Sequence, residues 1–180
     1  MRMTWLLVVG FVVSLLAACG GDETASCTGT GCTCADDACT CTAGTDCKAE
    51  CGDLDCELAC ASAAKCNGNT TGALTLTCSD SSECKGAGGD DSEVACAAST
   101  KCDFKVGQDS DVTCTVSSNC KIEAGDGSTI ACSGSAACTV KCDGNCKATC
   151  TDSSECAVTC GDAGAAATMC ATGVYACGPC

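Results

Sequence analysis

Cysteine is the residue type in this chain with the greatest capacity for chemistry. The 180 residues include 27 cysteines and no histidine. Thiols form disulfides in an oxidising compartment, bind soft metal ions as thiolates, or act as nucleophiles. The spacing favours disulfides, because pairs separated by about five residues recur along most of the chain. These pairs are Cys41/Cys47, Cys60/Cys66, Cys78/Cys84, Cys96/Cys102, Cys114/Cys120, Cys132/Cys138 and Cys150/Cys156.

The N-terminal residues have the features of an export signal. Arg2 supplies a positive charge, and the apolar run at residues 5–16 is too short to cross a bilayer comfortably. The run ends in Leu16-Ala17-Ala18-Cys19, which resembles the lipobox of bacterial lipoproteins. This resemblance implies a signal peptide at residues 1–18, a diacylglyceryl thioether on Cys19, cleavage before it and acylation of the new N-terminus.

The predicted lipid determines the expected compartment. Several acyl chains anchor a protein far better than one, since each buried CH₂ contributes about 0.8 kcal/mol. Residues 19–26 would be the lipidated cysteine, with palmitate among its acyl chains, and a short polar tether. Gly20 stands where Asp often retains lipoproteins in the inner membrane, so family analogy favours the outer membrane. We expect no cofactor besides the lipid on Cys19, a membrane partner through that lipid, and disulfides among the remaining 26 cysteines.

The cysteine pairs belong to a regular repeat. Six of the seven pairs begin 18 residues apart, and a fixed short period indicates a solenoid. Apolar residues stand two positions before each first cysteine and two positions after most second cysteines, so they share one face of short extended segments with the cysteines. The residues before are Leu58, Leu76, Val94, Val112, Ile130 and Ala148, and those after are Gly68, Gly86, Phe104, Ile122, Val140 and Val158.

This pattern predicts an all-β fold, a narrow disulfide-rich β-solenoid whose turns, here called rungs, contain about 18 residues. We expect a single domain over residues 27–180, with regular repeats over about 41–165. At the usual spacing of β-strands, about seven rungs would make a rod roughly 34 Å long.

Outward-pointing charges also favour parallel stacking. One rung apart, Glu83 would face Lys101, and Asp103 would face both Lys85 and Lys121. Like charges directly opposite each other are destabilising, so a parallel stack requires such an alternation of sign. A helical repeat would not place these columns in register.

The interior of so narrow a rung is expected to hold small side chains and sulfur and little else. After residue 18 the chain has 4 Leu, 7 Val and 2 Ile, too few for a conventional apolar core. Disulfides within the rungs would each contribute about 2–3 kcal/mol in the chain-entropy model. Cys51/Cys56 and Cys142/Cys146 are expected to bracket the opposite end of a rung. The sequence leaves open the partners of Cys27, Cys32, Cys34, Cys39, Cys160, Cys170, Cys177 and Cys180.

Two segments resemble the repeat of beetle antifreeze proteins. Residues 113–120 and 149–156 both read Thr-Cys-Thr, a small loop and a second cysteine. The resemblance covers roughly residues 40–156 and implies a disulfide-linked β-helix with a flat threonine array that binds ice. The beetle repeat is shorter, and Thr-x-Thr occurs on only three of the seven rungs of this chain. Ice or crystal-surface binding is therefore an alternative function.

Two other cysteine chemistries are also alternatives. Residues 32–34 and 39–41 have the C-x-C spacing that thiolate clusters favour, so the chain is alternatively a thiolate metal-binding protein. Cys177-Gly178-Pro179-Cys180 reads like the active-site tetrapeptide of thioredoxins. No helix is predicted after it to lower a thiol pKa, so we expect a structural disulfide there.

The composition argues against several function classes. A net charge of −14 and an aromatic content of 2% argue against nucleic-acid binding, which uses Lys, Arg and aromatic rings. The lack of histidine leaves little for catalysis, so we expect no enzyme, no metal site and no small-molecule substrate. Acidic turns such as residues 88–93 are expected to be solvated, with Ca²⁺ between rungs as an alternative. The preferred function is a non-enzymatic structural or binding rod in the cell envelope.

Overall fold

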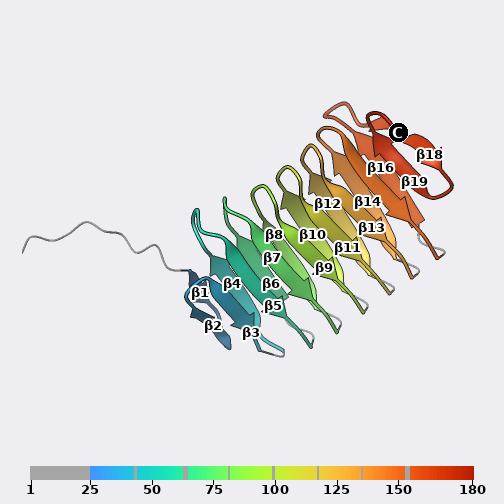
Figure 1. Ribbon diagram of the computed structural model, residues 1–180. Helices are drawn as coiled ribbons and strands as arrows, with labels where there is room; N and C mark the ends of the chain where they lie inside the picture. The colour runs from blue at the N-terminus through green and yellow to red at the C-terminus, as the bar shows by residue number, and fades with distance from the viewer. Residues whose placement is uncertain are drawn as a thin grey trace, which may run out of the picture.

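The chain forms a β-solenoid made of two long sheets that face each other (Figure 1). The structure, a computed structural model, describes residues 25–42, 44–62, 65–80, 82–98, 100–116, 118–134, 136–152 and 155–180. The predicted all-β solenoid with 18-residue rungs and many disulfides is confirmed. Cys19 and the predicted signal peptide lie outside the described residues. Within the described part of the chain, no helix is long and apolar enough to cross a membrane.

The two sheets, named A and B here, alternate along the chain. Sheet A contains, in spatial order, β1 (Ser26–Thr28), β4 (Asp46–Glu50), β6 (Lys65–Asn69), β8 (Glu83–Ala87), β10 (Lys101–Val106), β12 (Asn119–Ala124), β14 (Ala137–Cys142), β16 (Glu155–Cys160) and β17 (Ala165–Ala166). Sheet B contains β18 (Thr168–Ala171), β19 (Val174–Cys177), β15 (Cys146–Cys150), β13 (Thr129–Cys132), β11 (Asp111–Cys114), β9 (Glu93–Cys96), β7 (Leu74–Cys78), β5 (Cys56–Cys60), β3 (Ala38–Cys41) and β2 (Cys32–Ala35).

The rungs stack in the register that the repeat predicts. Cys102 pairs with Cys84 on one side and with Cys120 on the other, and the Cys96 column of sheet B has the same 18-residue offset. β4 to β16 make about six complete turns, one fewer than the seven rungs expected. At about 4.8 Å per strand, the first and last of these sheet A strands lie about 29 Å apart. The predicted charge contacts follow from this register, since Asp103 lies between Lys85 and Lys121.

Antiparallel strands cover both ends of the parallel stack. At the N-terminal end β1 pairs with β4 and β2 pairs with β3. At the C-terminal end β17 pairs with β16, β19 pairs with β15, and β18 pairs with β19. Uncovered parallel edges would recruit further strands, so caps of this kind are expected in solenoids.

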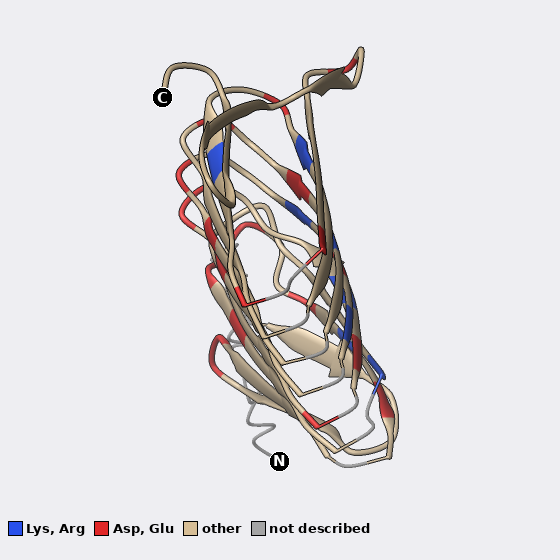
Figure 2. Ribbon diagram, turned by 90° about the vertical axis from the view of Figure 1, so that its right-hand side faces the viewer, with Lys and Arg blue, Asp and Glu red and all other residues tan. Residues whose placement is uncertain are grey.

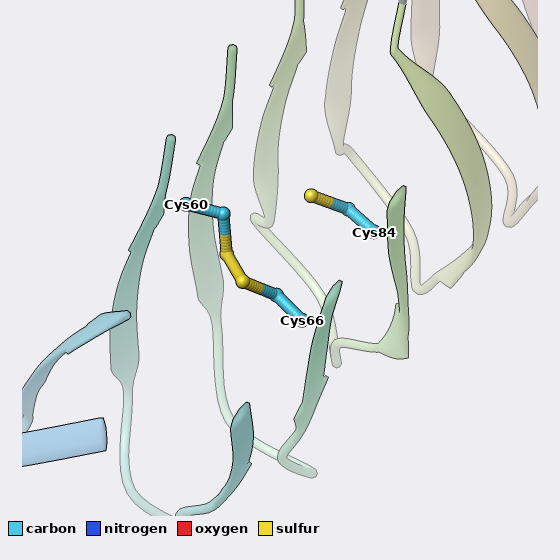
Figure 3. A group of neighbouring side chains, drawn as sticks. All are labelled: Cys60, Cys66 and Cys84. Atoms are coloured by element: carbon cyan, nitrogen blue, oxygen red, sulfur yellow. A yellow bond between two sulfur atoms is a disulfide. The ribbon is translucent and has the colours of Figure 1, made fainter. Parts of the chain in front are cut away.

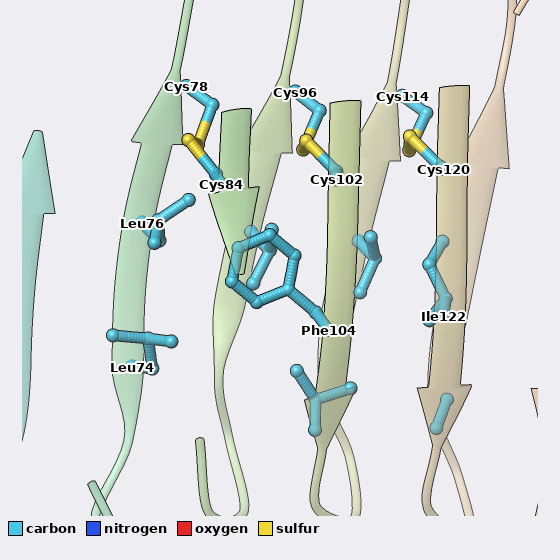
Figure 4. Packing of buried hydrophobic residues seen from close by; sticks show 14 of the residues in the cluster. Leu74, Leu76, Cys78, Cys84, Cys96, Cys102, Phe104, Cys114, Cys120 and Ile122 are labelled. Carbon is cyan, nitrogen blue, oxygen red and sulfur yellow. A yellow bond between two sulfur atoms is a disulfide. The ribbon is translucent and has the colours of Figure 1, made fainter. Parts of the chain in front are cut away.

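The interior is wider than the sequence indicated at one point. Phe104, Leu74 and Leu76 are fully buried (Figure 4), and so is Leu58. The expectation that the interior holds little besides small side chains and sulfur was therefore wrong. The physical reason is the column that Phe104 shares with glycine. Gly86 on the neighbouring rung has no side chain, and a Cβ there would collide with the Gly68 backbone. The column reads Gly68, Gly86, Phe104, Ile122 and Val140, so the ring lies beside a rung whose residue has no side chain.

The turns that follow β8, β10 and β12 contain a column of buried serines that the repeat pattern did not predict. The hydroxyls of Ser92, Ser110 and Ser128 are stacked at 18-residue intervals, and all three residues are buried. The Ser92 amide donates to Ser110 Oγ at 3.1 Å, and the Ser110 amide donates to Ser128 Oγ at 3.2 Å. Each hydroxyl also donates to a carbonyl, such as Ser92 Oγ to Gly89 at 2.8 Å. Buried polar groups of the turns are thereby satisfied.

Acidic residues of these turns also have a structural role. The Asp90 carboxylate accepts the amide of Gln108 at 2.7 Å, and the Asp55 carboxylate accepts that of Ala73 at 2.9 Å. Asp126 accepts the amide of Asn145 in the same way. The expectation of merely solvated acidic turns is therefore refined, because some of these carboxylates join one rung to the next.

Candidate functional site: a disulfide column and two faces

The structure brings together every cysteine pair singled out by its spacing. Disulfides join Cys41 to Cys47 and connect the six exact repeats in the same way: Cys60–Cys66, Cys78–Cys84, Cys96–Cys102, Cys114–Cys120, Cys132–Cys138 and Cys150–Cys156. Each links the end of a sheet B strand to the start of a sheet A strand. The expected bridges across the opposite end, Cys51–Cys56 and Cys142–Cys146, are also present.

The structure also supplies the partners that the sequence left open. They are Cys27–Cys32, Cys34–Cys39, Cys160–Cys177 and Cys170–Cys180. The thioredoxin-like tetrapeptide is therefore not an internal disulfide, because Cys177 and Cys180 are bonded to different cysteines upstream. Long-range pairs such as Cys160–Cys177 depend on how the C-terminal cap folds back, which the repeat does not encode.

The sulfurs of neighbouring rungs lie close together in the core. Cys60 and Cys66 form one disulfide, and the Cys84 sulfur belongs to the next, yet all three sulfurs lie within 4.8 Å of one another (Figure 3). Similar groups recur along the rod, for example Cys78, Cys96 and Cys102. The thiolate is the form of cysteine that binds metal, and a disulfide sulfur is not a thiolate. The metal-binding alternative therefore requires the reduced chain.

The outer face of sheet A carries nearly all the positive charge. Seven of the eight lysines in the sequence lie there, among six acidic residues (Figure 2). The lysines are Lys48, Lys65, Lys85, Lys101, Lys105, Lys121 and Lys141. Two shallow troughs of about 400 Å³ and 260 Å³ follow this face over the N-terminal and middle rungs. The face is thus mixed in charge, whereas the rest of the rod is strongly acidic.

Ion pairs on sheet A shift the pKa of some of its charged groups. A hydrogen bond from Lys48, together with one from Asn69, lowers the pKa of Glu50 below its ordinary value, and the Lys48–Glu50 ion pair measures 2.8 Å. A hydrogen bond from Lys85 at 3.2 Å likewise lowers the pKa of Glu83. These groups are solvent-exposed, so the pairs add little to stability.

The pKa of Lys141 shifts in the opposite direction. Hydrogen bonds to Asp162 at 3.0 Å and to Asp143 at 3.3 Å raise it above its ordinary value.

The outer face of sheet B is chemically different. Its central column contains only threonine and alanine, in strict alternation, each paired in register with the next: Thr40, Ala59, Thr77, Ala95, Thr113, Ala131 and Thr149. The adjoining column, directly after the first cysteines, also lacks charge: Thr42, Ala61, Ser79, Ala97, Thr115, Ser133 and Thr151. We call these two columns the threonine–alanine strip.

The strip has a period of two rungs. Its central threonines therefore recur about every 9.6 Å along the rod, at twice the strand spacing. The Thr-x-Thr motif that occurred on only three rungs is part of this alternation, with Thr77-Cys78-Ser79 as a fourth hydroxyl-bearing rung. The sequence contained this signal, but it becomes evident only when strand register assigns Thr77 and Ala95 to neighbouring positions of one column.

The chain matches no protein-family model, no curated protein and no solved structure.

Proposed function

We propose that the protein is a lipid-anchored rod of the bacterial cell envelope, without enzymatic activity, which displays the threonine–alanine strip for binding. The observation that carries this proposal is the uninterrupted register of disulfide-linked rungs. Such a stack is stiff along its axis and holds its outward columns at fixed spacing. A display or spacing role requires those two properties.

The place of the rod relative to the membrane follows from the predicted anchor. β1 begins at Ser26, only seven residues after Cys19. The N-terminal end of the rod would therefore lie near the bilayer, and the C-terminal cap would point away from it. The excess of negative charge would keep the rod away from anionic headgroups while the lipid holds it in place.

Replacement of the anchor cysteine tests this proposal. In Cys19→Ala we expect loss of palmitate labelling and release of the chain from the membrane fraction, with the disulfides retained. Gly20→Asp serves as the matched sorting variant, with the protein expected to move from the outer to the inner membrane. Wild-type protein that carries no lipid on Cys19, or membrane attachment that survives Cys19→Ala, would contradict the proposal.

A second candidate function is binding to ice or another crystal surface, which the alternation of the strip favours. A periodic array of hydroxyl and methyl groups, without charge within the strip, is suited to a periodic partner. Thr113→Lys would place a charged side chain in the middle of this array. We expect it to abolish thermal hysteresis, whereas Thr139→Lys, on the exposed face of sheet A, leaves it unchanged. Absence of thermal hysteresis in the wild-type protein would exclude ice as the partner.

A further inference from the structure

We propose that the Cys170–Cys180 disulfide is a thiol-exchange site, at which an external thiol becomes covalently joined to Cys180. This bond lies in the C-terminal cap, and both of its cysteines line a cavity of about 370 Å³. Thiol exchange would give this one bond a chemical function beyond the structural role of the other disulfides.

Accessibility distinguishes this bond from the others. Cys180 is the one exposed cysteine among the residues that the structure describes, and Cys170 is partly buried. Cys96 and Cys102, by contrast, are buried between the two sheets. Exchange requires a thiolate to reach one sulfur of the disulfide, so access controls which bond reacts. The geometry therefore places attack at the sulfur of Cys180.

The cavity also contains a positive charge. Lys147, on β15, lines it together with Cys170 and Cys180. This lysine is the one that lies outside sheet A, and it takes part in no ion pair among the described residues. A nearby cation favours the thiolate over the thiol, both for an incoming nucleophile and for the departing cysteine.

The reaction is an exchange with no net oxidation. An external thiol, R–SH, ionises to R–S⁻ and attacks Sγ of Cys180. A new R–S–Sγ bond forms, the Cys170–Cys180 bond breaks, and Cys170 leaves as a thiolate that takes up the proton released by R–SH. The thiol of Cys170 can reverse the step by attacking the mixed disulfide after ionising again.

The solenoid does not depend on this bond. β19 pairs with β15 over four residues, and Cys160–Cys177 connects β19 to β16 covalently. Cys170–Cys180 constrains only β18 and the residues after β19. Exchange at Cys180 is therefore possible while every rung keeps its own disulfide.

Titration with reduced glutathione tests the proposal. The natively exported full chain, solubilised in detergent, is incubated with increasing glutathione, quenched with acid and mapped by peptide mass spectrometry. We expect the first product to carry one glutathione on Cys180 and one free thiol on Cys170, with an unchanged circular dichroism spectrum. First adducts on other cysteines, or loss of all disulfides in a single step, would overturn the proposal.

Matched variants identify the groups responsible. Cys170→Ser with Cys180→Ser should abolish the first adduct, whereas Cys27→Ser with Cys32→Ser, at the opposite cap, should retain it. Lys147→Gln should slow adduct formation severalfold, and Lys121→Gln on sheet A should not. An unchanged rate in Lys147→Gln would overturn the assignment of the reaction to this cavity. If a double variant fails to fold, the adduct map of the wild-type chain decides the question.

Discussion

Sheets A and B share one interior and have opposite exteriors. Inside, both contribute cysteine and apolar residues to one buried core. Outside, sheet A presents lysines among carboxylates, whereas the threonine–alanine strip of sheet B has no titratable group. The disulfide-linked interior fixes the backbone, so each outer face is free to vary in chemistry. A perturbation of the interior should therefore affect both faces, and a perturbation of one face should leave the other intact.

A cavity in the shared core should destabilise the protein most. Phe104→Ala removes the largest fully buried side chain, in a column where the adjacent Gly86 has no side chain to fill the space. We expect a loss of about 3–5 kcal/mol in the free energy of unfolding with disulfides intact, because a cavity remains. Denaturant unfolding measures this loss, and Phe104→Leu should lower the free energy of unfolding by less. A loss no greater than that of the surface variant Thr139→Ala would show that the core is not packed as described.

The serine column gives the next largest effect. Ser110 is completely buried, accepts the Ser92 amide and donates to carbonyls of its own turn. Ser110→Ala should lower the free energy of unfolding by about 1–3 kcal/mol, since buried polar groups lose their partner. Thr129→Ala, at an exposed position of β13, is the control and should have little effect. Equal stability of the two variants would show that the hydrogen bonds of the serine column do not stabilise the fold.

A loop substitution should stabilise the rod without altering either face. Val116 has a φ of 51° and is exposed, and this left-handed conformation is unfavourable for a β-branched residue. Equivalent loops place Asp80 or Gly134 at this position. Val116→Asn should raise the free energy of unfolding by about 1 kcal/mol, and Val116→Ile should not. Thermal melting checks this, and a lower melting temperature for Val116→Asn would contradict the loop geometry.

The smallest effect should be a dependence on pH that comes from the ion pairs of sheet A. The pKa values of Glu50 and Glu83 in the folded protein lie below 4.5. Their ion pairs therefore stabilise the fold above pH 4.5, and this contribution is lost as pH falls through the folded pKa values. The pKa of Lys141 is raised in the folded protein, so its ion pairs stabilise the fold below pH 10.5. This contribution is lost as pH rises through the folded pKa.

Melting temperatures measured at neutral pH and well below 4.5 should therefore fall slightly less in Glu83→Gln than in the wild-type protein. Any binding by the threonine–alanine strip should not change over the same range. Binding by the strip that changes with pH would contradict the separation of the two faces.

The sequence predicted the regular part of this fold because that part is encoded locally. The spacing of Cys78 and Cys84, repeated every 18 residues, determines the loop, the register and the inward face together. The caps were not predictable in the same way, because Cys170–Cys180 and Cys160–Cys177 depend on antiparallel strands that break the repeat. The buried serine column was not predictable from the sequence, because a glycine-rich turn with a buried serine has the same composition as an exposed loop.

Phe104 was underestimated for a related reason. An 18-residue rung is narrow on average, but the space that a ring requires depends on the residues one rung away. Only the pairing of Phe104 with Gly86 shows that the ring has room. Residues that share a column on neighbouring rungs, and not residues adjacent in the chain, therefore determine both the core packing and the pattern of the threonine–alanine strip.

Disulfide mapping of the natively exported protein tests directly whether each rung is closed by its own disulfide. Alkylation before reduction should label no cysteine, and alkylation after reduction should label 26. Peptide mapping should then join Cys78 to Cys84 and Cys96 to Cys102, as the stacked rungs require. Substantial free thiol with co-purifying metal, or pairs that cross between rungs, would contradict the disulfide-linked rod and the two faces that depend on it.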